Sequence, residues 1–184
     1  NTVSNNTITT PTRSGIYLIS WGTNYNIFSS NTITTSTGNG ITLYYRPAYN
    51  NFSSNTIIAS GTNGYGIELH DEANSNTFSN NTIIASGING WGILLRYSNN
   101  NIFSGINIKT NNTGEYAIYI YEGTLGFPSN FIIRDSILNS SLVPELYVRS
   151  AVTGGIWNFT NVTRANENPI TVNWSAGANG ILNM

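Results

Sequence analysis

The stretch NNFSSNTIIASGTNGYGIEL at residues 50–69 returns almost unchanged as NTFSNNTIIASGINGWGILL at residues 76–95. Its Gly-Ile-x-Leu part recurs about every 25 residues along the chain, and a Phe-to-Ile part recurs out of phase with it. A period of this length is typical of a solenoid, in which each repeat buries its apolar face only by stacking on its neighbours. The copies of the first part begin at Gly15, Gly40, Gly66, Gly92, Ala117, Glu145 and Pro169, and those of the second begin at Phe28, Phe52, Phe78, Phe103, Ile132 and Trp157.

The chain of 184 residues carries few charges. Charged residues make up 8% of it and the net charge is −1, whereas an average globular domain has about 25% charged residues. Such a surface offers no basic field for nucleic acid. The absence of cysteine excludes disulfides, zinc–thiolate sites and a thiol nucleophile. No apolar run approaches the roughly 20 residues of a membrane-spanning helix, and no secretion signal opens the chain.

Asparagine is abundant, and a disordered Asn-rich tract would be one explanation. We reject it because Ile, Leu, Phe and Tyr recur at fixed places, which a disordered chain has no reason to maintain. The chain begins at Asn1 in the middle of a repeat. We therefore expect it to be a piece of a longer protein.

The Gly-Ile-x-Leu segments alternate with a period of two, so Ile16 and Leu18 share one face of a strand while Tyr17 and Ile19 share the other. Each repeat offers three short segments of this kind, joined by turns rich in Asn, Gly and Ser. The segments lack helical spacing, which argues against a helical solenoid. The sequence predicts an all-β parallel β-helix of about seven coils, with three short strands per coil and about 4.8 Å between coils.

Stacking like on like predicts ladders of equivalent residues inside the coils. The aromatic ladder contains Phe28, Phe52, Phe78 and Phe103, with Val3 below and Ile132 and Trp157 above; the aliphatic one contains Ile8, Ile33, Ile57, Ile83, Ile108, Ile137 and Val162. Two asparagine columns are expected to bond from coil to coil and so satisfy buried polar groups. They contain Asn1, Asn26, Asn50, Asn76, Asn101 and Asn130, and Asn6, Asn31, Asn55 and Asn81.

The spacing Asn-x-Phe-x-x-Asn-x-Ile followed by Gly-Ile-x-Leu resembles the right-handed parallel β-helix repeat family. This family includes the NosD-type periplasmic proteins and belongs to the broader pectin-lyase-like fold. The resemblance implies a right-handed coil, an extracellular or cell-surface location, and roles in carbohydrate chemistry or at surfaces. We expect a single domain over residues 1–184, regular over 1–120 and looser over 121–184, with a protruding loop near 122–130.

The outward side of the Gly-Ile-x-Leu strands gathers most of the chemistry-bearing side chains. Enzymes of the fold that this chain resembles use this strand face, which makes Glu68, Asp71, His70 and Arg96 catalytic candidates. The alternative is a polar face with an ion pair between Arg46 and Glu72. His70, Asp71 and Glu72 lack metal-ligand spacing, so we expect no metal and no cofactor. The copper role of the NosD-type proteins is not carried over, because the chain has one His and no Cys.

Aromatic residues supply the candidate ligand-binding positions. Tyr44, Tyr45 and Tyr121 are candidates for stacking on sugar rings. Tyr65, Trp91 and Tyr116 occupy equivalent places on consecutive coils. They form either a second sugar-binding strip or a column of rings packed on one another.

Several Asn-x-Ser/Thr triplets are candidate glycosylation sites, although composition alone predicts about as many. The candidates are Asn51, Asn80, Asn111, Asn139, Asn158 and Asn173. Three functions compete: an extracellular structural element, a glycan-binding or adhesive module, and a polysaccharide lyase, hydrolase or epimerase. Since neither end looks capped, we expect self-association through the ends, with stacking into a filament as the structural form. Glycans are the other expected partner.

Overall fold

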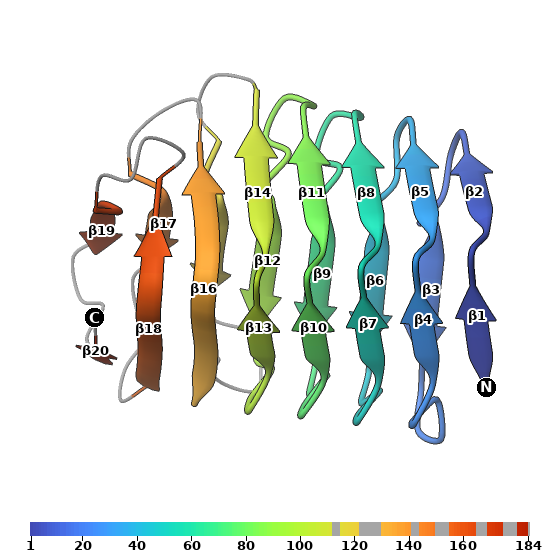
Figure 1. Ribbon diagram of the computed structural model, residues 1–184, viewed down its shortest axis with the longest axis horizontal. Helices are drawn as coiled ribbons and strands as arrows, with labels where there is room; N and C mark the ends of the chain where they lie inside the picture. Colours follow the sequence, from blue (N-terminus) through green and yellow to red (C-terminus); the bar gives the residue numbers. More distant parts are fainter. Residues whose placement is uncertain are drawn as a thin grey trace.

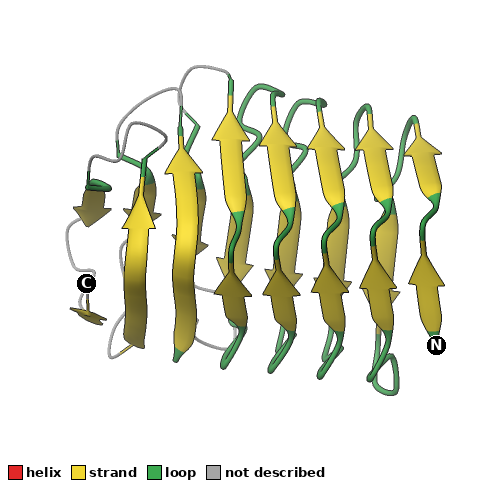
Figure 2. Cartoon of the chain, viewed as in Figure 1, coloured by secondary structure: helices red, strands yellow, loops and turns green. Residues whose placement is uncertain are grey.

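The computed structural model describes residues 1–111, 115–121, 130–140, 144–149, 155–164, 169–174 and 180–183. Within these ranges every regular element is a β-strand, and the strands wind into one solenoid that runs from right to left in Figure 1. Two sheets form its walls, with the larger sheet in front and the smaller one behind (Figure 2). The predicted all-β parallel coil is confirmed, although coils of three strands number five in the described ranges rather than the predicted seven.

Each coil contributes strands to both sheets. The 13-stranded sheet contains β1 (Thr2–Ser4), β2 (Thr7–Thr10), β4 (Ile27–Ser29), β5 (Thr32–Thr35), β7 (Asn51–Ser53), β8 (Thr56–Ala59), β10 (Thr77–Ser79), β11 (Thr82–Ala85), β13 (Ile102–Ser104), β14 (Asn107–Thr110), β16 (Phe131–Asn139), β18 (Gly155–Thr163) and β20 (Gly180–Asn183). The 7-stranded sheet contains β3 (Ile16–Ile19), β6 (Ile41–Tyr44), β9 (Ile67–His70), β12 (Ile93–Arg96), β15 (Ile118–Tyr121), β17 (Leu146–Val148) and β19 (Val172–Trp174).

Neighbouring coils pair in parallel and in register. Ile41 lies between Ile16 and Ile67, as the repeat predicts. Strands β1 to β15 form five coils of three strands each. In the two windings that follow, the first two strands merge into one of nine residues, β16 and then β18. The bend between them survives as a single residue of positive φ, Asp135 at 51° and Asn161 at 52°.

The aromatic ladder forms the centre of the core. Phe28, Phe52, Phe78 and Phe103 stack with ring centroids 4.8–4.9 Å apart. Beyond Phe103 the prediction was wrong, because Ile133 and then Phe159 continue the column. Ile132 and Trp157 lie one and two residues off this register. Because side chains alternate across a strand, a slip of one residue exchanges inside for outside.

The aliphatic ladder and the last Gly-Ile-x-Leu copy show the same kind of slip. Ile108 faces Leu138 rather than Ile137, and Ile137 is 38% exposed. Leu146 faces Val172, whereas the repeat pattern predicts Ile170 at this place. These errors follow connections longer than those of the first coils. The proposed loop near 122–130 lies outside the described residues except for Asn130, and the division of the chain at residue 120 stays a prediction.

Both asparagine columns form hydrogen-bonded ladders. The Asn55 amide Nδ2 donates to Asn81 Oδ1 at 3.0 Å and to the Phe28 carbonyl at 2.9 Å, and its Oδ1 accepts from the Asn31 side chain at 3.0 Å. In the other column Asn50 links Asn26 and Asn76 in the same way. That column ends at Asn101, because Phe131 rather than Asn130 takes the next place. The ladders satisfy polar groups that the stacking buries.

A contact between glycine and isoleucine ties the two sheets together. A Cβ at Gly40 would lie 2.1 Å from Ile57 Cγ2, and one at Gly66 would lie 2.2 Å from Ile83 Cγ2. Glycine is required here because the isoleucine of the next coil occupies the space of a side chain. The glycine column continues through Ala117 to Glu145.

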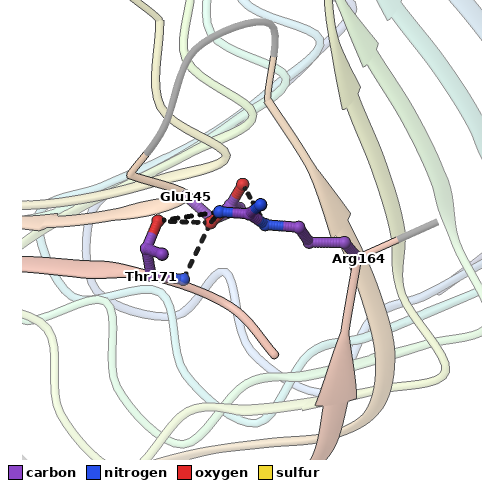
Figure 3. Close-up of polar contacts among 3 residues, drawn as sticks. All are labelled: Glu145, Arg164 and Thr171. Carbon is purple, nitrogen blue, oxygen red and sulfur yellow. Dashed lines mark hydrogen bonds and ion pairs between the residues drawn. The ribbon is translucent and has the colours of Figure 1, made fainter. Parts of the chain in front are cut away.

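At the end of the glycine column an ion pair between Glu145 and Arg164 replaces the glycine–isoleucine contact. Arg164 follows the Ile137–Thr163 pair by one residue, so it stands in the isoleucine column. Its Nε lies 2.9 Å from Glu145 Oε1, and its Nη2 donates to Glu145 Oε2 at 3.2 Å (Figure 3). The Thr171 N–H and hydroxyl donate to the same Oε2 at 2.8 and 2.7 Å. Glu145 is only 2% exposed, so its charge is stabilised by these donors rather than by water.

The Asn55→Ala variant tests the ladder. It removes an acceptor from the Asn31 amide Nδ2 and from the Asn31 backbone N–H, and one of the two donors to Asn81 Oδ1. We therefore expect it to lower the free energy of unfolding by about 1–3 kcal/mol. Asn51→Ala is the matched control, since Asn51 is exposed and surface changes stay within about 0.5 kcal/mol. Urea denaturation followed by circular dichroism measures both. Equal effects of the two variants would contradict a structural role for the ladder.

A second prediction concerns the Glu145–Arg164 pair. Arg164→Ala leaves a buried carboxylate without its counter-ion and is expected to cost about 3 kcal/mol. The double variant Glu145→Gly with Arg164→Ile recreates the contact of the preceding coils and should recover most of that loss. Denaturation curves of the single and double variants decide the matter. A double variant no more stable than Arg164→Ala would show that the pair does not replace the glycine–isoleucine contact.

Candidate functional site

The outward face of the 7-stranded sheet brings most of the predicted site residues together. On β9 the side chains of Glu68 and His70 point outward, and in the next coil Leu94 lies beside Glu68 while Arg96 lies beside His70. The pairing register that stacks equivalent residues in the core therefore also places equivalent outward side chains above one another. Two outward columns result: Tyr17, Thr42, Glu68, Leu94, Tyr119 and Tyr147, and beside it Ile19, Tyr44, His70, Arg96 and Tyr121.

The second column is a stack of rings and guanidinium groups. The ring of Tyr44 stacks on that of His70 with centroids 5.1 Å apart. Arg96 and Arg149, from the coils on either side of Tyr121, place their Cζ atoms 4.9 and 4.4 Å from its ring centroid. Cation–π contacts of this kind are worth about 0.5–1 kcal/mol at exposed sites. Tyr121 therefore packs against two arginines, and its role in stacking on a sugar ring stays a prediction, as do those of Tyr44 and Tyr45.

The predicted aromatic strip is a packed column. Tyr65 stacks on Trp91 at 5.0 Å with an interplanar angle of 10°, and Trp91 stacks on Tyr119 at 3.9 Å and 4°. Tyr116 stacks on Tyr147 at 4.8 Å instead of continuing from Trp91. Trp91 therefore stacks on a ring from the coil on either side of it. Sequence reasoning missed the role of Tyr119 and Tyr147, although both occupy the variable position of Gly-Ile-x-Leu.

A hollow lies on the outward face of the 7-stranded sheet, between the packed aromatic column and the column that contains Arg96 and Tyr121. Its volume is about 190 Å³, and it is lined by Tyr65, Trp91, Leu94, Arg96, Tyr121 and Arg149. This is less than the roughly 300–1,000 Å³ of pockets for drug-sized ligands. It suits one residue of a polymer that extends along the face. Two cationic groups and an apolar wall converge on this space.

Glu68 lies next to the hollow. Its Oε2 accepts a hydrogen bond from Asn39 Nδ2 of the preceding coil at 2.7 Å. Burial raises the pKa of the Glu68 carboxyl, while the charge of Arg96 and the Asn39 hydrogen bond oppose this and Asp71 adds to it. Glu68 therefore keeps its proton to a higher pH than an ordinary carboxyl.

His70 and Asp71 interact with each other. His70 Nε2 lies 3.4 Å from Asp71 Oδ1. Burial lowers the pKa of His70, Arg96 lowers it further, and Asp71 opposes both. Glu68 and Asp71 thus have different partners, Asn39 for the first and His70 for the second. Catalytic roles for Glu68, Asp71, His70 and Arg96 stay predictions.

The ion pair between Arg46 and Glu72, which the sequence predicts for a purely polar face, is present. Arg46 Nε contacts Glu72 Oε2, and the two side chains are 33% and 24% exposed. The Arg46 guanidinium also lies 4.1 Å from the centroid of the Trp21 ring and 5.6 Å from that of Tyr45. The Tyr97 hydroxyl donates to Glu72 Oε1 at 3.3 Å. Tyr45 does not line the hollow; it has Arg46 as its charged neighbour, and its ring lies 6.4 Å from that of Tyr44.

The candidate glycosylation sites differ in accessibility. Asn51, Asn80 and Asn111 are exposed, while Asn139 and Asn158 are half-buried, and the side chain of Asn173 lies outside the described part. Over the described ranges no three His, Asp or Glu side chains form a group that could hold a metal ion. In the same ranges no helix is long and apolar enough to cross a membrane.

A comparison with protein families gives one match. The family model described as the right-handed β-helix region matches residues 1–174. The chain belongs to this family. Members of the right-handed β-helix family are often extracellular or surface proteins. Searches of curated proteins and of solved structures returned no match. The more specific resemblance to NosD-type proteins stays a prediction.

The raised pKa of Glu68 predicts how stability depends on pH. The unfolded chain loses this proton near the ordinary pKa of 4.5, while the folded chain keeps it to a higher pH. The stabilisation that Glu68 contributes is therefore complete below pH 4.5 and lost as the pH rises through its folded pKa. Glu68→Gln keeps an acceptor for Asn39 but cannot ionise.

We therefore expect the stability of Glu68→Gln relative to the native protein to increase between pH 4 and pH 7. Urea denaturation at several pH values measures this difference, and an NMR titration of the Glu68 carboxyl measures the pKa itself. A difference that does not change with pH, or a pKa at or below 4.5, would contradict the prediction.

Proposed function

We propose that this protein is an extracellular or cell-surface β-helix that binds an acidic glycan on the outward face of its 7-stranded sheet. The observation that carries the proposal is the hollow in which Arg96 and Arg149 meet the aromatic wall of Tyr65 and Trp91. Guanidinium groups bind carboxylates and sulfates through paired, charge-assisted hydrogen bonds. The hollow thus combines a site for an anion with an apolar wall for a sugar ring.

The two arginines are held in position. Both contact the Tyr121 ring, so less side-chain freedom is lost when a ligand binds them than would be lost by isolated surface arginines. Arg96 Nε is buried and makes no hydrogen bond within the described part of the chain. The same guanidinium lines the hollow, so a ligand carboxylate there is a suitable acceptor for it.

The geometry favours a polymer over a small ligand. The hollow is shallow and holds about one sugar residue, while the columns on either side continue along the coil axis past His70 and Tyr44. A chain lying along the axis would contact one coil after another, about 4.8 Å apart. Several weak contacts then add up by multivalency.

Removal of both guanidinium groups tests the proposal. Arg96→Ala with Arg149→Ala should weaken binding of an acidic oligosaccharide such as an oligouronate at least tenfold, since each charged hydrogen bond contributes about 1.5–3 kcal/mol. Isothermal titration calorimetry measures the affinity. Arg134→Ala is the control, because Arg134 is an exposed arginine of β16 on the other sheet.

Three outcomes would count against the proposal. The first is no binding of any acidic oligosaccharide by the native protein, and the second is an equal loss in the Arg134 control. The third is equal affinity for a neutral glucan, which would show that the arginines do not select charge.

The position of Glu68 favours a second candidate, cleavage or epimerisation of the bound glycan. A carboxyl with a raised pKa beside the hollow is suited to act as a general acid. Turnover of an acidic polysaccharide that Glu68→Gln abolishes, with binding retained, would support it. Stacking of the protein into filaments stays a prediction from the sequence.

A further inference from the structure

The outward face of the 13-stranded sheet carries a regular array of uncharged residues, most of them serine or threonine. Over the first four coils its four columns are Thr2, Ile27, Asn51 and Thr77; Ser4, Ser29, Ser53 and Ser79; Thr7, Thr32, Thr56 and Thr82; and Thr9, Thr34, Ile58 and Ile84. Every column is in register from coil to coil. In Figure 1 these strands lie side by side on the front of the molecule. In the fifth coil Asn107 and Lys109 take the next places in the third and fourth columns.

The array has two fixed repeats. Along the coil axis, equivalent side chains are separated by the strand spacing of about 4.8 Å, and along a strand Thr32 and Thr34 are two residues, or about 6.6 Å, apart. In-register pairing keeps these distances constant over four coils. Each pair of columns is therefore a two-dimensional array of small groups, mostly methyl and hydroxyl, and the two pairs are separated by the bend at positive-φ residues such as Ser30 and Ser54.

The hydroxyl groups of this array are unpaired within residues 1–111, all of which the structure describes. No serine or threonine side chain of the four columns hydrogen-bonds to another protein group there. Threonines next to the array behave differently, since Thr10 and Thr35 donate to the carbonyls of Arg13 and Gly38 at 2.6 and 2.7 Å. The array hydroxyls are left to bond with whatever lies outside.

The chemistry of the face restricts what that partner is. Its sixteen positions carry no charge and no aromatic ring, although the chain contains 11 tyrosines and 4 tryptophans. A charged partner gains nothing here, and a crystalline polysaccharide would find no ring to stack on. A second copy of the chain would have to desolvate a dozen hydroxyl groups and pair them across the interface.

We propose that this face binds the surface of ice. Water molecules in ice repeat in two dimensions at distances comparable with those of the array. Water bonded to the threonine and serine hydroxyls keeps nearly the enthalpy of a direct hydrogen bond, and the methyl groups of Thr and Ile occupy the spaces between. Adsorption then needs no partner charge, and the regular spacing lets many weak contacts act together.

The test uses the purified protein in an ice-recrystallisation assay and in a measurement of thermal hysteresis. The native protein should slow the growth of ice crystals and shape them. Thr56→Lys and Thr82→Lys place charges in the middle of the array and should lower this activity at least about tenfold. Thr56→Tyr is the second variant, because Tyr retains a high preference for strands while its ring stands above the face.

Thr62→Tyr is the matched control, since Thr62 is exposed in the turn between β8 and β9; it should leave the ice activity unchanged. Thermal denaturation verifies that each variant is folded. An inactive native protein overturns the proposal, as does activity that the Thr56 and Thr82 variants retain. Binding to crystalline cellulose or chitin without an effect on ice would assign the face to a polysaccharide. Dimerisation that Thr56→Lys abolishes would assign it to a second copy.

Discussion

Parallel pairing of each coil with its equivalent in the next coil is the constraint on which the whole structure depends. It places Ile41 between Ile16 and Ile67, and it converts a repeat in sequence into columns in space. Inside the coils the columns become the phenylalanine stack and the asparagine ladders. Outside they become the arginine–tyrosine stack and the threonine array. The same hydrogen-bond register therefore arranges the core and both surfaces for which a function is proposed.

The fold could be predicted because two features of the sequence recur together. One is a pair of apolar residues two positions apart, and the other is an asparagine at the turn before each strand. Asn55, for example, has no other reason to recur at a fixed distance from Phe52. After Tyr121 the connections lengthen, and alignment by residue type alone then selected Ile137 where Leu138 is buried. The slip also concealed the Glu145–Arg164 pair, since Val162 was placed in the column that Arg164 occupies.

The candidate site could be predicted in part. The outward positions of Glu68, His70 and Arg96 follow from alternation along the strand, so their meeting on one face was foreseeable. The orientation of each aromatic ring could not be predicted: Trp91 stacks on Tyr119 rather than on Tyr116. The use of Tyr121 as a support for two arginines depends on side chains from three coils. Such contacts depend on rotamers, which a repeat pattern does not specify.

The Glu145–Arg164 pair has a consequence for how the chain finds its native alignment. Because the coils have nearly the same sequence, a coil can pair with the wrong neighbour, one repeat away from its native partner, with little loss of apolar burial. The other residues of these two columns are small or aliphatic. A shift by one repeat would therefore be costly, because it would bury Glu145 against an aliphatic side chain without its counter-ion. The pair thus favours the native pairing register of an otherwise repetitive chain.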